Sequence, residues 1–249
     1  MKTTLVFLHG LLGTQADWKK LSENLPHFDC IALDLPWHGS AKNYPVQDFD
    51  ETCAYVAKQI QRAVGNQPYF LVGYSLGGRI ALYYALYSQQ EKYNLQGLII
   101  EGGNLGLCDE EEKKVRWKND VFWAQRFSRE TAKSVLNDWY QQAVFAHLTE
   151  GQRRALIEQR QANCGDNIAQ MLLATSLAKQ PDLRPYVKNS PYPIYYFCGE
   201  RDHKFKQMAL DNQLNLSVIP NAGHNAHQEN PMAFAAQLNA LLRDKFIAF

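Results

Sequence analysis

The sequence of 249 residues has little net charge, no long apolar run and no closely paired cysteines. Lys and Arg number 26 and Asp and Glu 25, so the formal net charge is only +1 and no overall field attracts nucleic acid or acidic membranes. No stretch approaches the roughly 18 apolar residues of a membrane span. The apolar residues after Lys2 are too few for a secretion signal and predict a buried strand instead. These absences predict no nucleic-acid partner and no stable membrane insertion.

The five cysteines are odd in number, scattered along the chain and never spaced as C-x-x-C. This pattern argues against a disulfide framework and against a zinc site. We interpret them as buried free thiols, predict a cytoplasmic location and expect no bound metal ion. The cysteines are Cys30, Cys53, Cys108, Cys164 and Cys198.

The length and a hydrophobic content of 46% are enough for one well-buried α/β domain over residues 1–249. Short apolar runs alternate with segments of helical spacing. Because the runs are apolar throughout, they predict a mostly parallel sheet with helices on both faces. The predicted strands are 5–8, 30–33, 69–72, 95–100, 194–197 and 214–219, and the helices beside them are 16–25, 49–64, 78–88, 204–212 and 231–246.

The alternation is interrupted from about residue 108 to about residue 185, where no strand pattern occurs. This predicts an all-helical insertion between two strands, with helices at 110–127, 130–143, 150–163 and 168–179. The insertion is rich in Trp and Arg, as a cap over a binding site would be. The alternative is that most of these arginines only form the solvated faces of the helices.

The pentapeptide Gly73-Tyr74-Ser75-Leu76-Gly77 lies between a predicted strand and a predicted helix. It matches the nucleophile elbow of α/β-hydrolase enzymes, in which the serine is held in a strained turn above the sheet. Glycine is needed on both sides because a Cβ there would collide with the neighbouring strand or helix. The pentapeptide alone is also compatible with an ordinary Gly-rich turn, so the flanking elements carry the prediction.

A serine hydroxyl becomes reactive when a histidine takes its proton and a carboxylate orients that histidine. In the α/β-hydrolase order, the acid and then the histidine follow the serine, each in a loop after a strand. Asp202 and His224 fit this order and are the predicted partners of Ser75.

Other residues near these two loops remain open alternatives. Glu200 or Asp211 could be the acid, and Asp202 could simply cap the helix that follows it. His227 could replace His224 as the base. The glycine before His224 favours His224, because it lets the loop approach the elbow closely.

The loop His9-Gly10-Leu11-Leu12-Gly13 follows the first predicted strand. In the α/β-hydrolase fold, this loop and the residue after the serine supply backbone N–H groups to an oxyanion hole, which predicts Leu11 and Leu76. We interpret His9 as a brace that hydrogen-bonds within the loop. Residues 34–40 resemble the D-x-x-G-x-G-x-S turn, with Trp37 where glycine is frequent, and we interpret them as a structural turn.

Several longer motifs resemble one family more closely than they resemble the fold in general. They are Gly73-Tyr74-Ser75-Leu76-Gly77-Gly78-Arg79, Glu101-Gly102-Gly103, Asp138-Trp139-Tyr140-Gln141-Gln142, Cys198-Gly199-Glu200-Arg201-Asp202-His203-Lys204-Phe205 and Gly223-His224-Asn225-Ala226-His227-Gln228-Glu229-Asn230-Pro231. Together they resemble the 2-succinyl-6-hydroxy-2,4-cyclohexadiene-1-carboxylate synthases of menaquinone biosynthesis. The resemblance runs from the first strand to the last helix, and its cap and histidine motifs are more specific than the elbow.

The resemblance implies a lyase that removes pyruvate from 2-succinyl-5-enolpyruvyl-6-hydroxy-3-cyclohexene-1-carboxylate without metal or organic cofactor. Such a polycarboxylate needs several guanidinium partners. The anion-binding residues that the family implies here are Tyr74, Arg79, Arg116, Trp139 and Arg160.

Two positions depart from the family pattern. Asn104-Leu105 stand where a His-Pro pair is expected, and His203 stands where a small polar residue is usual.

Two other classes of function remain open. A serine esterase or a carbon–carbon bond hydrolase would use the same triad through an acyl-enzyme. A non-catalytic binding protein would keep the fold without turnover, which the complete triad and oxyanion loop disfavour. The sequence indicates nothing about the oligomeric state.

Overall fold

The computed structural model describes residues 2–243 and contains one sheet of six strands. The strands are β1 (Thr3–Leu8), β2 (Phe28–Leu33), β3 (Tyr69–Tyr74), β4 (Leu95–Glu101), β5 (Ile194–Gly199) and β6 (Asn215–Ile219). Every neighbouring pair is parallel, in the order β2-β1-β3-β4-β5-β6. All six predicted strands are therefore confirmed, with ends that shift by one or two residues.

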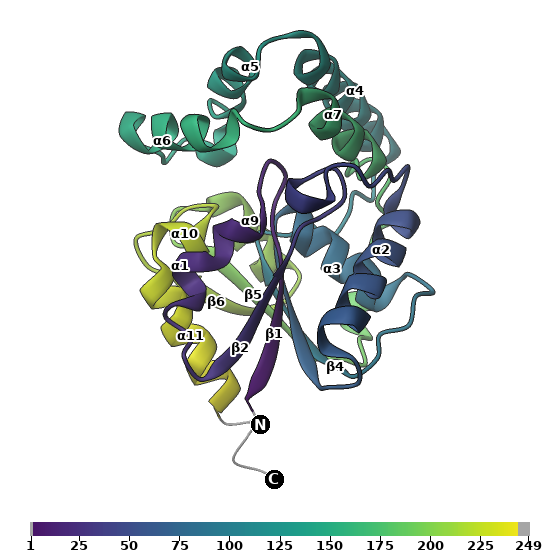
Figure 1. The fold of residues 1–249 in the computed structure, drawn as a ribbon, viewed down its shortest axis with the longest axis vertical. Coiled ribbons are helices and arrows are strands. Elements are labelled where there is room, and N and C mark those ends of the chain that lie inside the picture. Colours follow the sequence, from purple (N-terminus) through teal and green to yellow (C-terminus); the bar gives the residue numbers. More distant parts are fainter. Residues whose placement is uncertain (1, 244–249) are drawn as a thin grey trace.

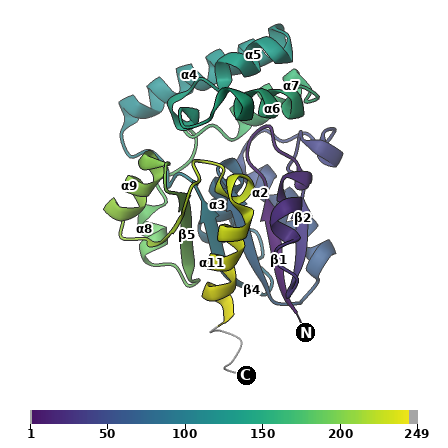
Figure 2. The ribbon, with the colours of Figure 1, turned by 90° about the vertical axis from the view of Figure 1, so that its left-hand side faces the viewer.

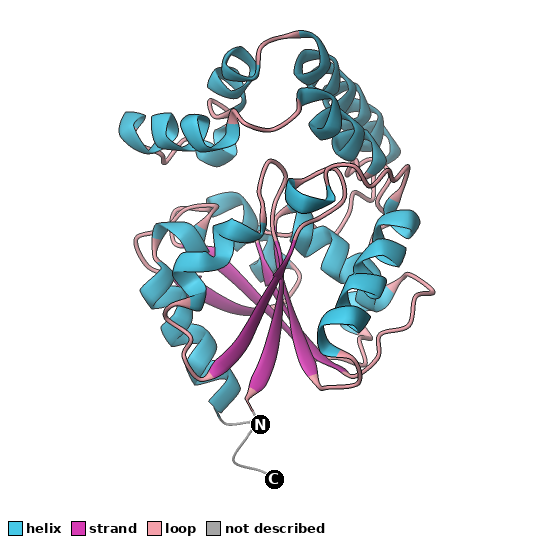
Figure 3. Cartoon of the chain, viewed as in Figure 1, coloured by secondary structure: helices cyan, strands magenta, loops and turns pink. Residues whose placement is uncertain are grey.

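Helices cover both faces of this sheet (Figures 1 and 3). On one face, α2 (Phe49–Val64), α3 (Leu76–Leu86) and α9 (His203–Asp211) pack against apolar strand residues in one core cluster. On the other, α1 (Lys19–Ser22) and α11 (Pro231–Arg243) close a second cluster, and Figure 2 shows α11 lying along this face. The α/β-hydrolase arrangement predicted from the sequence is confirmed.

Between β4 and β5 the chain forms a series of helices, the first four of which lie beyond the carboxyl ends of the strands (Figures 1 and 2). We refer to the first four as the cap helices: α4 (Glu110–Arg129), α5 (Ala132–Trp139), α6 (Glu150–Arg160) and α7 (Gly165–Ala174). Local signals place the starts of the first three, since Asp109, Thr131 and Thr149 each accept a hydrogen bond from a backbone N–H of the first turn.

Several predicted helix boundaries were wrong. The segment 16–25 is a 3₁₀ turn, Gln15–Trp18, followed by the short α1, and 168–179 is replaced by α7, which starts earlier and stops at Ala174. A further helix, α8 (Arg184–Lys188), was not predicted; proline stands in its first turn, where it is tolerated but breaks the helical pattern. Residues 244–246 of the last predicted helix lie outside the described residues.

The cysteine prediction was partly wrong. All five cysteines are free, and Cys53 and Cys198 are buried, but Cys30 is partly buried and Cys108 and Cys164 are exposed. The two exposed thiols lie in the connections that precede α4 and α7. Within residues 2–243, no helix is both long and apolar enough to cross a membrane.

Candidate active site

Ser75 occupies the sharp turn between β3 and α3. Its backbone angles, φ 50° and ψ −107°, lie in the positive-φ region that side chains rarely adopt, which indicates strain at this position. A Cβ on Gly73 would lie 2.5 Å from Gly77 O, and one on Gly77 would collide with the carbonyl of Leu8. The two flanking glycines are thus required by close packing, as the sequence predicted.

The structure brings Ser75 together with His224 and Asp202. His224 Nδ1 lies 2.7 Å from Asp202 Oδ2, and His224 Nε2 lies 3.3 Å from Ser75 Oγ. Because a carboxylate only accepts, Nδ1 carries the proton and Nε2 faces the serine hydroxyl as an acceptor. Both partners are buried. This is the arrangement of a serine–histidine–acid triad.

Asp202 fulfils both interpretations that the sequence left open. Its Oδ2 accepts from His224, while its Oδ1 accepts from the backbone N–H of Phe205 and caps α9. A carboxylate has four lone-pair sites, so the two contacts do not compete.

The other candidates for acid and base lie elsewhere. Glu200 accepts from the backbone of Asn221, and Asp211 accepts from Gln207 on the exposed side of α9. His227 is fully buried, where its Nδ1 lies 2.6 Å from a Glu101 oxygen. The geometry therefore favours Asp202 and His224.

The loop after β1 is held by two neutral histidines. His9 donates from Nδ1 to Gly10 O and accepts the Leu35 N–H at Nε2, and His38 Nε2 accepts the Leu12 N–H. Burial lowers the pKa of His9 and lowers that of His38 to about 3, so both stay uncharged at neutral pH. The predicted bracing role of His9 is consistent with these bonds.

Leu11 and Leu76 both line the cavity that contains Ser75. Leu76 is the first residue of α3, so its N–H has no partner within the helix. Residues 34–40 form a turn around Asp34, which accepts from Gln15 N, Ser40 N and Ser40 Oγ. Trp37 has a φ of 65°, which explains why glycine is frequent at this place in similar turns.

The cavity beside Ser75 measures about 120 Å³ and is rich in positive charge. Arg79, Arg116 and Lys204 line it, together with Trp139 and Asn104. Arg116 pairs with Asp120 at 2.8 Å. Arg79 is buried and donates to Thr175 O and Gln180 Oε1, both neutral, and no carboxylate among residues 2–243 forms an ion pair with it.

Arg79 is therefore a buried cation without a counter-ion in the part of the chain that the structure describes. Burial, together with the charge of Arg116, lowers the pKa of Arg79 to about 9, so the guanidinium is still charged at neutral pH. Burying an unpaired charge is costly. An anionic group in the adjacent cavity would compensate it.

A second cavity of about 300 Å³ lies beyond Leu11 and Trp139, which line both cavities. Tyr74 and Arg160 line this second cavity rather than the first. Arg160 is not free: its Nη1 and Nη2 donate to both oxygens of Asp17 at 2.8 and 2.6 Å, in a buried pair that joins α6 to the turn before α1. Asp17 lies 143 residues away from Arg160 in the sequence and was not predicted as its partner.

We expect Asp17→Asn to destabilise the protein, because it leaves the Arg160 guanidinium buried without a counter-charge. The free energy of unfolding should fall by about 3 kcal/mol or more, measured by urea denaturation. Glu150→Gln is the control, since Glu150 is exposed and lies 3.8 Å from Arg154, and it should leave the unfolding midpoint unchanged. Equal midpoints for the two variants would show that the buried pair does not stabilise the cap.

Two residues near the triad had no role assigned from the sequence. Phe205 stacks on His224 with ring centroids 4.9 Å apart, and Lys204 lines the Ser75 cavity. Both belong to the sequence motif that surrounds Asp202, and this motif is the signal from which a role at the site could have been predicted.

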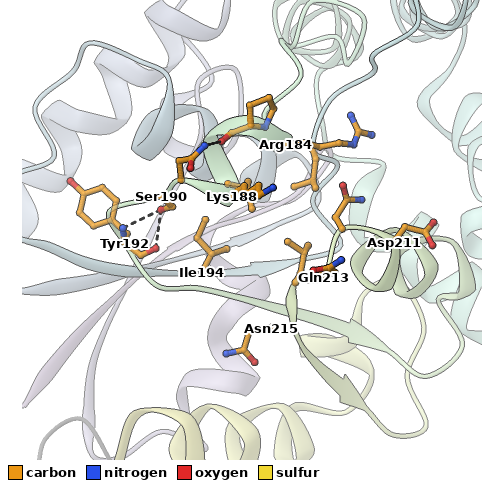
Figure 4. A pocket seen from close by; sticks show the side chains of 14 residues that line it. Arg184, Lys188, Ser190, Tyr192, Ile194, Asp211, Gln213 and Asn215 are labelled. Carbon is orange, nitrogen blue, oxygen red and sulfur yellow. Dashed lines mark hydrogen bonds between the residues drawn. The ribbon is translucent and has the colours of Figure 1, made fainter.

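A larger hollow of about 700 Å³ lies between α8 and the start of β6 (Figure 4). Its lining includes Arg184, Lys188, Asp211 and Gln213, and no residue of the triad, the oxyanion loop or the expected anion-binding set. In residues 2–243, no group of three or more His, Cys, Asp or Glu side chains is arranged to hold a metal ion.

Comparison with known proteins agrees with this geometry. The α/β hydrolase fold family matches residues 3–231. A protein of Haemophilus influenzae, provisionally named 2-succinyl-6-hydroxy-2,4-cyclohexadiene-1-carboxylate synthase, is 59% identical over 96% of this chain and 97% of its own length. The synthase of that name from Serratia proteamaculans is 46% identical over 96% of this chain and 92% of its own. This chain belongs to the 2-succinyl-6-hydroxy-2,4-cyclohexadiene-1-carboxylate synthase family.

The structural comparison supports the same family. The structure of MenH from S. aureus matches with a TM-score of 0.88 and 26% identity, covering 98% of this chain and 94% of that one. The resemblance to the synthase family inferred from the motifs is confirmed.

Asn104 and His203, which depart from the synthase pattern, lie in different environments. Asn104 lines the Ser75 cavity and holds the loop after β4, accepting from Gly106 N and Gln180 Nε2. His203 is exposed, and the hydrogen bonds of Asp202 are formed beside it.

Proposed function

We propose that this chain catalyses the elimination of pyruvate from 2-succinyl-5-enolpyruvyl-6-hydroxy-3-cyclohexene-1-carboxylate, with Ser75, His224 and Asp202 as its catalytic residues. The observation that carries this proposal is the unpaired Arg79 guanidinium in the same cavity as Ser75. A cation without a counter-ion beside a reactive serine favours an anionic substrate over a neutral ester. Membership of the synthase family supports the particular reaction.

The triad would act as a proton relay. His224 Nε2 accepts the Ser75 Oγ proton, and Ser75 takes the acidic ring proton next to the succinyl ketone. The enolate oxygen that forms is stabilised by the N–H groups of Leu11 and Leu76. Asp202 keeps His224 in the required tautomer and stabilises the imidazolium.

The electron pair of this enolate then moves through the ring and expels the enolpyruvyl group. The bond between the ring carbon and the enolpyruvyl oxygen breaks, and the departing enolate of pyruvate takes the proton from His224. Atoms balance without water, and the serine never bonds to carbon. The substrate carboxylates would contact Arg79 and Arg116 in the first cavity and Tyr74, Trp139 and Arg160 around the second.

Arg160 can serve the substrate only in part. Its contact with Asp17 uses two of its five N–H groups and the Tyr140 side chain engages it as well, so only part of the guanidinium remains to meet an anion. Because Arg160 is already paired with Asp17, it should bind a substrate carboxylate more weakly than Arg79 does. We therefore expect Arg79 to contribute more to substrate binding.

A serine hydrolase of the same fold is the second candidate. The strained elbow and the 3.3 Å contact between Ser75 and His224 are also what an acyl-enzyme mechanism requires. The two mechanisms share every residue of the triad and differ in whether Ser75 bonds to substrate carbon.

We expect purified protein to release pyruvate from the enolpyruvyl substrate faster than enzyme-free solution does, as measured by coupled oxidation of NADH. Turnover should show no burst and no mass increase of the intact protein, and deuterium at the abstracted ring position should slow kcat where proton removal limits the rate. Neutral p-nitrophenyl esters should be poor substrates, because they offer no partner for Arg79.

Two results would change the assignment. A stoichiometric burst with such esters and a Ser75 adduct, without pyruvate formation, would favour the hydrolase. No turnover of either substrate would favour a binding protein. The proposal also includes a cytoplasmic location, which cell fractionation would test.

A further inference from the structure

The carboxylate of Glu229 lies between the His224 loop and the cap. Its Oε2 accepts the backbone N–H of Gly223 at 2.8 Å, and its Oε1 accepts that of Asn225 at 3.2 Å. The same Oε1 lies 3.0 Å from Nε2 of His147, in the chain segment between α5 and α6. One side chain therefore binds the residue before His224, the residue after it, and the cap.

These contacts are sheltered from solvent. The side chains of Glu229 and His147 are 10% and 9% exposed, so their hydrogen bonds meet little competition from water. Because a carboxylate only accepts, His147 Nε2 donates to Glu229. Hydrogen bonds to an ionised acceptor are about twice as strong as neutral ones.

His147 also lies directly over the loop. A Cβ on Gly223 would collide with the His147 ring, so glycine is required here by close approach of the cap. The glycine before His224, which the sequence analysis related to the elbow, thus makes room for a cap side chain.

The other partners of His224 hold its ring but not its backbone. Asp202 contacts Nδ1, and Phe205 stacks on one face of the ring. Glu229 adds a constraint on the backbone, because it binds the N–H groups of the residues before and after His224. A base must be held within hydrogen-bond reach of the serine, and a displacement of about 1 Å can cost about 100-fold in rate.

We propose that Glu229 is a positioning residue for His224, which it connects through His147 to the cap. The inference rests on the proposed role of His224 as the base, and it does not depend on the identity of the substrate. Glu229→Gln is the informative variant, because one end of the amide can still accept whereas its NH₂ end would face N–H donors.

The test measures how fast a fluorophosphonate probe labels Ser75. In this reaction the Ser75 Oγ–P bond forms, the P–F bond breaks with loss of fluoride, and the Oγ proton passes to His224. The labelling rate therefore reports the serine–histidine contact without the lyase substrate. We expect Glu229→Gln to lower the rate constant by about tenfold to 100-fold while every molecule is eventually labelled. The kcat for pyruvate release should fall in parallel, with KM within about twofold.

Glu200→Gln is the matched control. Glu200 also accepts a backbone N–H of this loop, that of Asn221, but it does not flank His224. Its labelling rate should stay within about twofold of wild type. His147→Ala, which removes one of the three donors, should lower the rate less than Glu229→Gln does.

The extent of labelling separates positioning from a merely structural role. If Glu229→Gln reduces the fraction of molecules labelled while the rate constant is unchanged, Glu229 only supports folding and the inference is wrong. An unchanged rate with full labelling also overturns it. If Glu229→Gln is labelled slowly but the wild-type protein forms no pyruvate, the inference stands and only the lyase reaction is rejected. Absence of labelling in the wild type would reject the triad and this inference together.

Discussion

Replacing Ser75 with alanine is expected to lower the rate of pyruvate formation by roughly 10³-fold or more, the usual effect of losing a triad member. Alanine has no hydroxyl to pass a proton to His224 or to receive one from the ring. The measurement is kcat with saturating enolpyruvyl substrate. A variant with more than a tenth of wild-type activity would reject the role of Ser75.

The thermal unfolding midpoint of the Ser75→Ala variant should stay close to that of wild type. The residue is partly exposed and contributes strain at φ 50° rather than packing, and alanine would keep the same strained backbone. A large fall in the midpoint would mean that the loss of activity reflects unfolding.

The second large effect is expected for Arg79→Ala. The buried guanidinium has neutral partners only, so a substrate carboxylate would be its counter-ion, and losing a desolvated charge pair of this kind costs about 2 to 5 kcal/mol in kcat/KM. Arg79→Lys should restore little, because an ammonium lacks the planar fork. Steady-state kinetics with the enolpyruvyl substrate measure both variants.

Arg154→Ala is the control for Arg79. This arginine lies on α6 with an exposed side chain and only a 3.8 Å contact to Glu150, so its removal should leave kcat/KM unchanged. Arg160→Ala should also weaken catalysis, but it leaves the buried Asp17 without its counter-ion and lowers stability as well. If Arg79→Ala keeps kcat/KM within twofold of wild type, the cavity beside Ser75 does not bind a carboxylate through this residue.

The triad could be predicted from sequence because each member is placed by a local rule. Ser75, Asp202 and His224 each follow a strand, and the carboxyl ends of parallel strands meet at one edge of the sheet. The glycines around Ser75 report steric demands that any sequence with this turn must meet. Such signals need no knowledge of distant contacts.

Contacts between the cap and the sheet domain could not be predicted in this way. Asp17 and Arg160 are 143 residues apart, and His147 and Glu229 are 82 apart, so no spacing or periodicity relates them. Sequence patterns placed Arg160 on a helix but could not show that it forms an ion pair with Asp17. The split of the expected binding residues between two cavities also arises from how the cap packs.

The double role of Asp202 restricts how this loop can change. Its carboxylate orients His224 with one oxygen and begins α9 with the other, so the acid is fixed to a helix rather than carried on an independent loop. An insertion or deletion between Gly199 and Phe205 would separate the two contacts by a whole residue. We therefore expect this segment to tolerate exchanges of exposed side chains such as His203, while its length stays fixed among proteins that retain the triad.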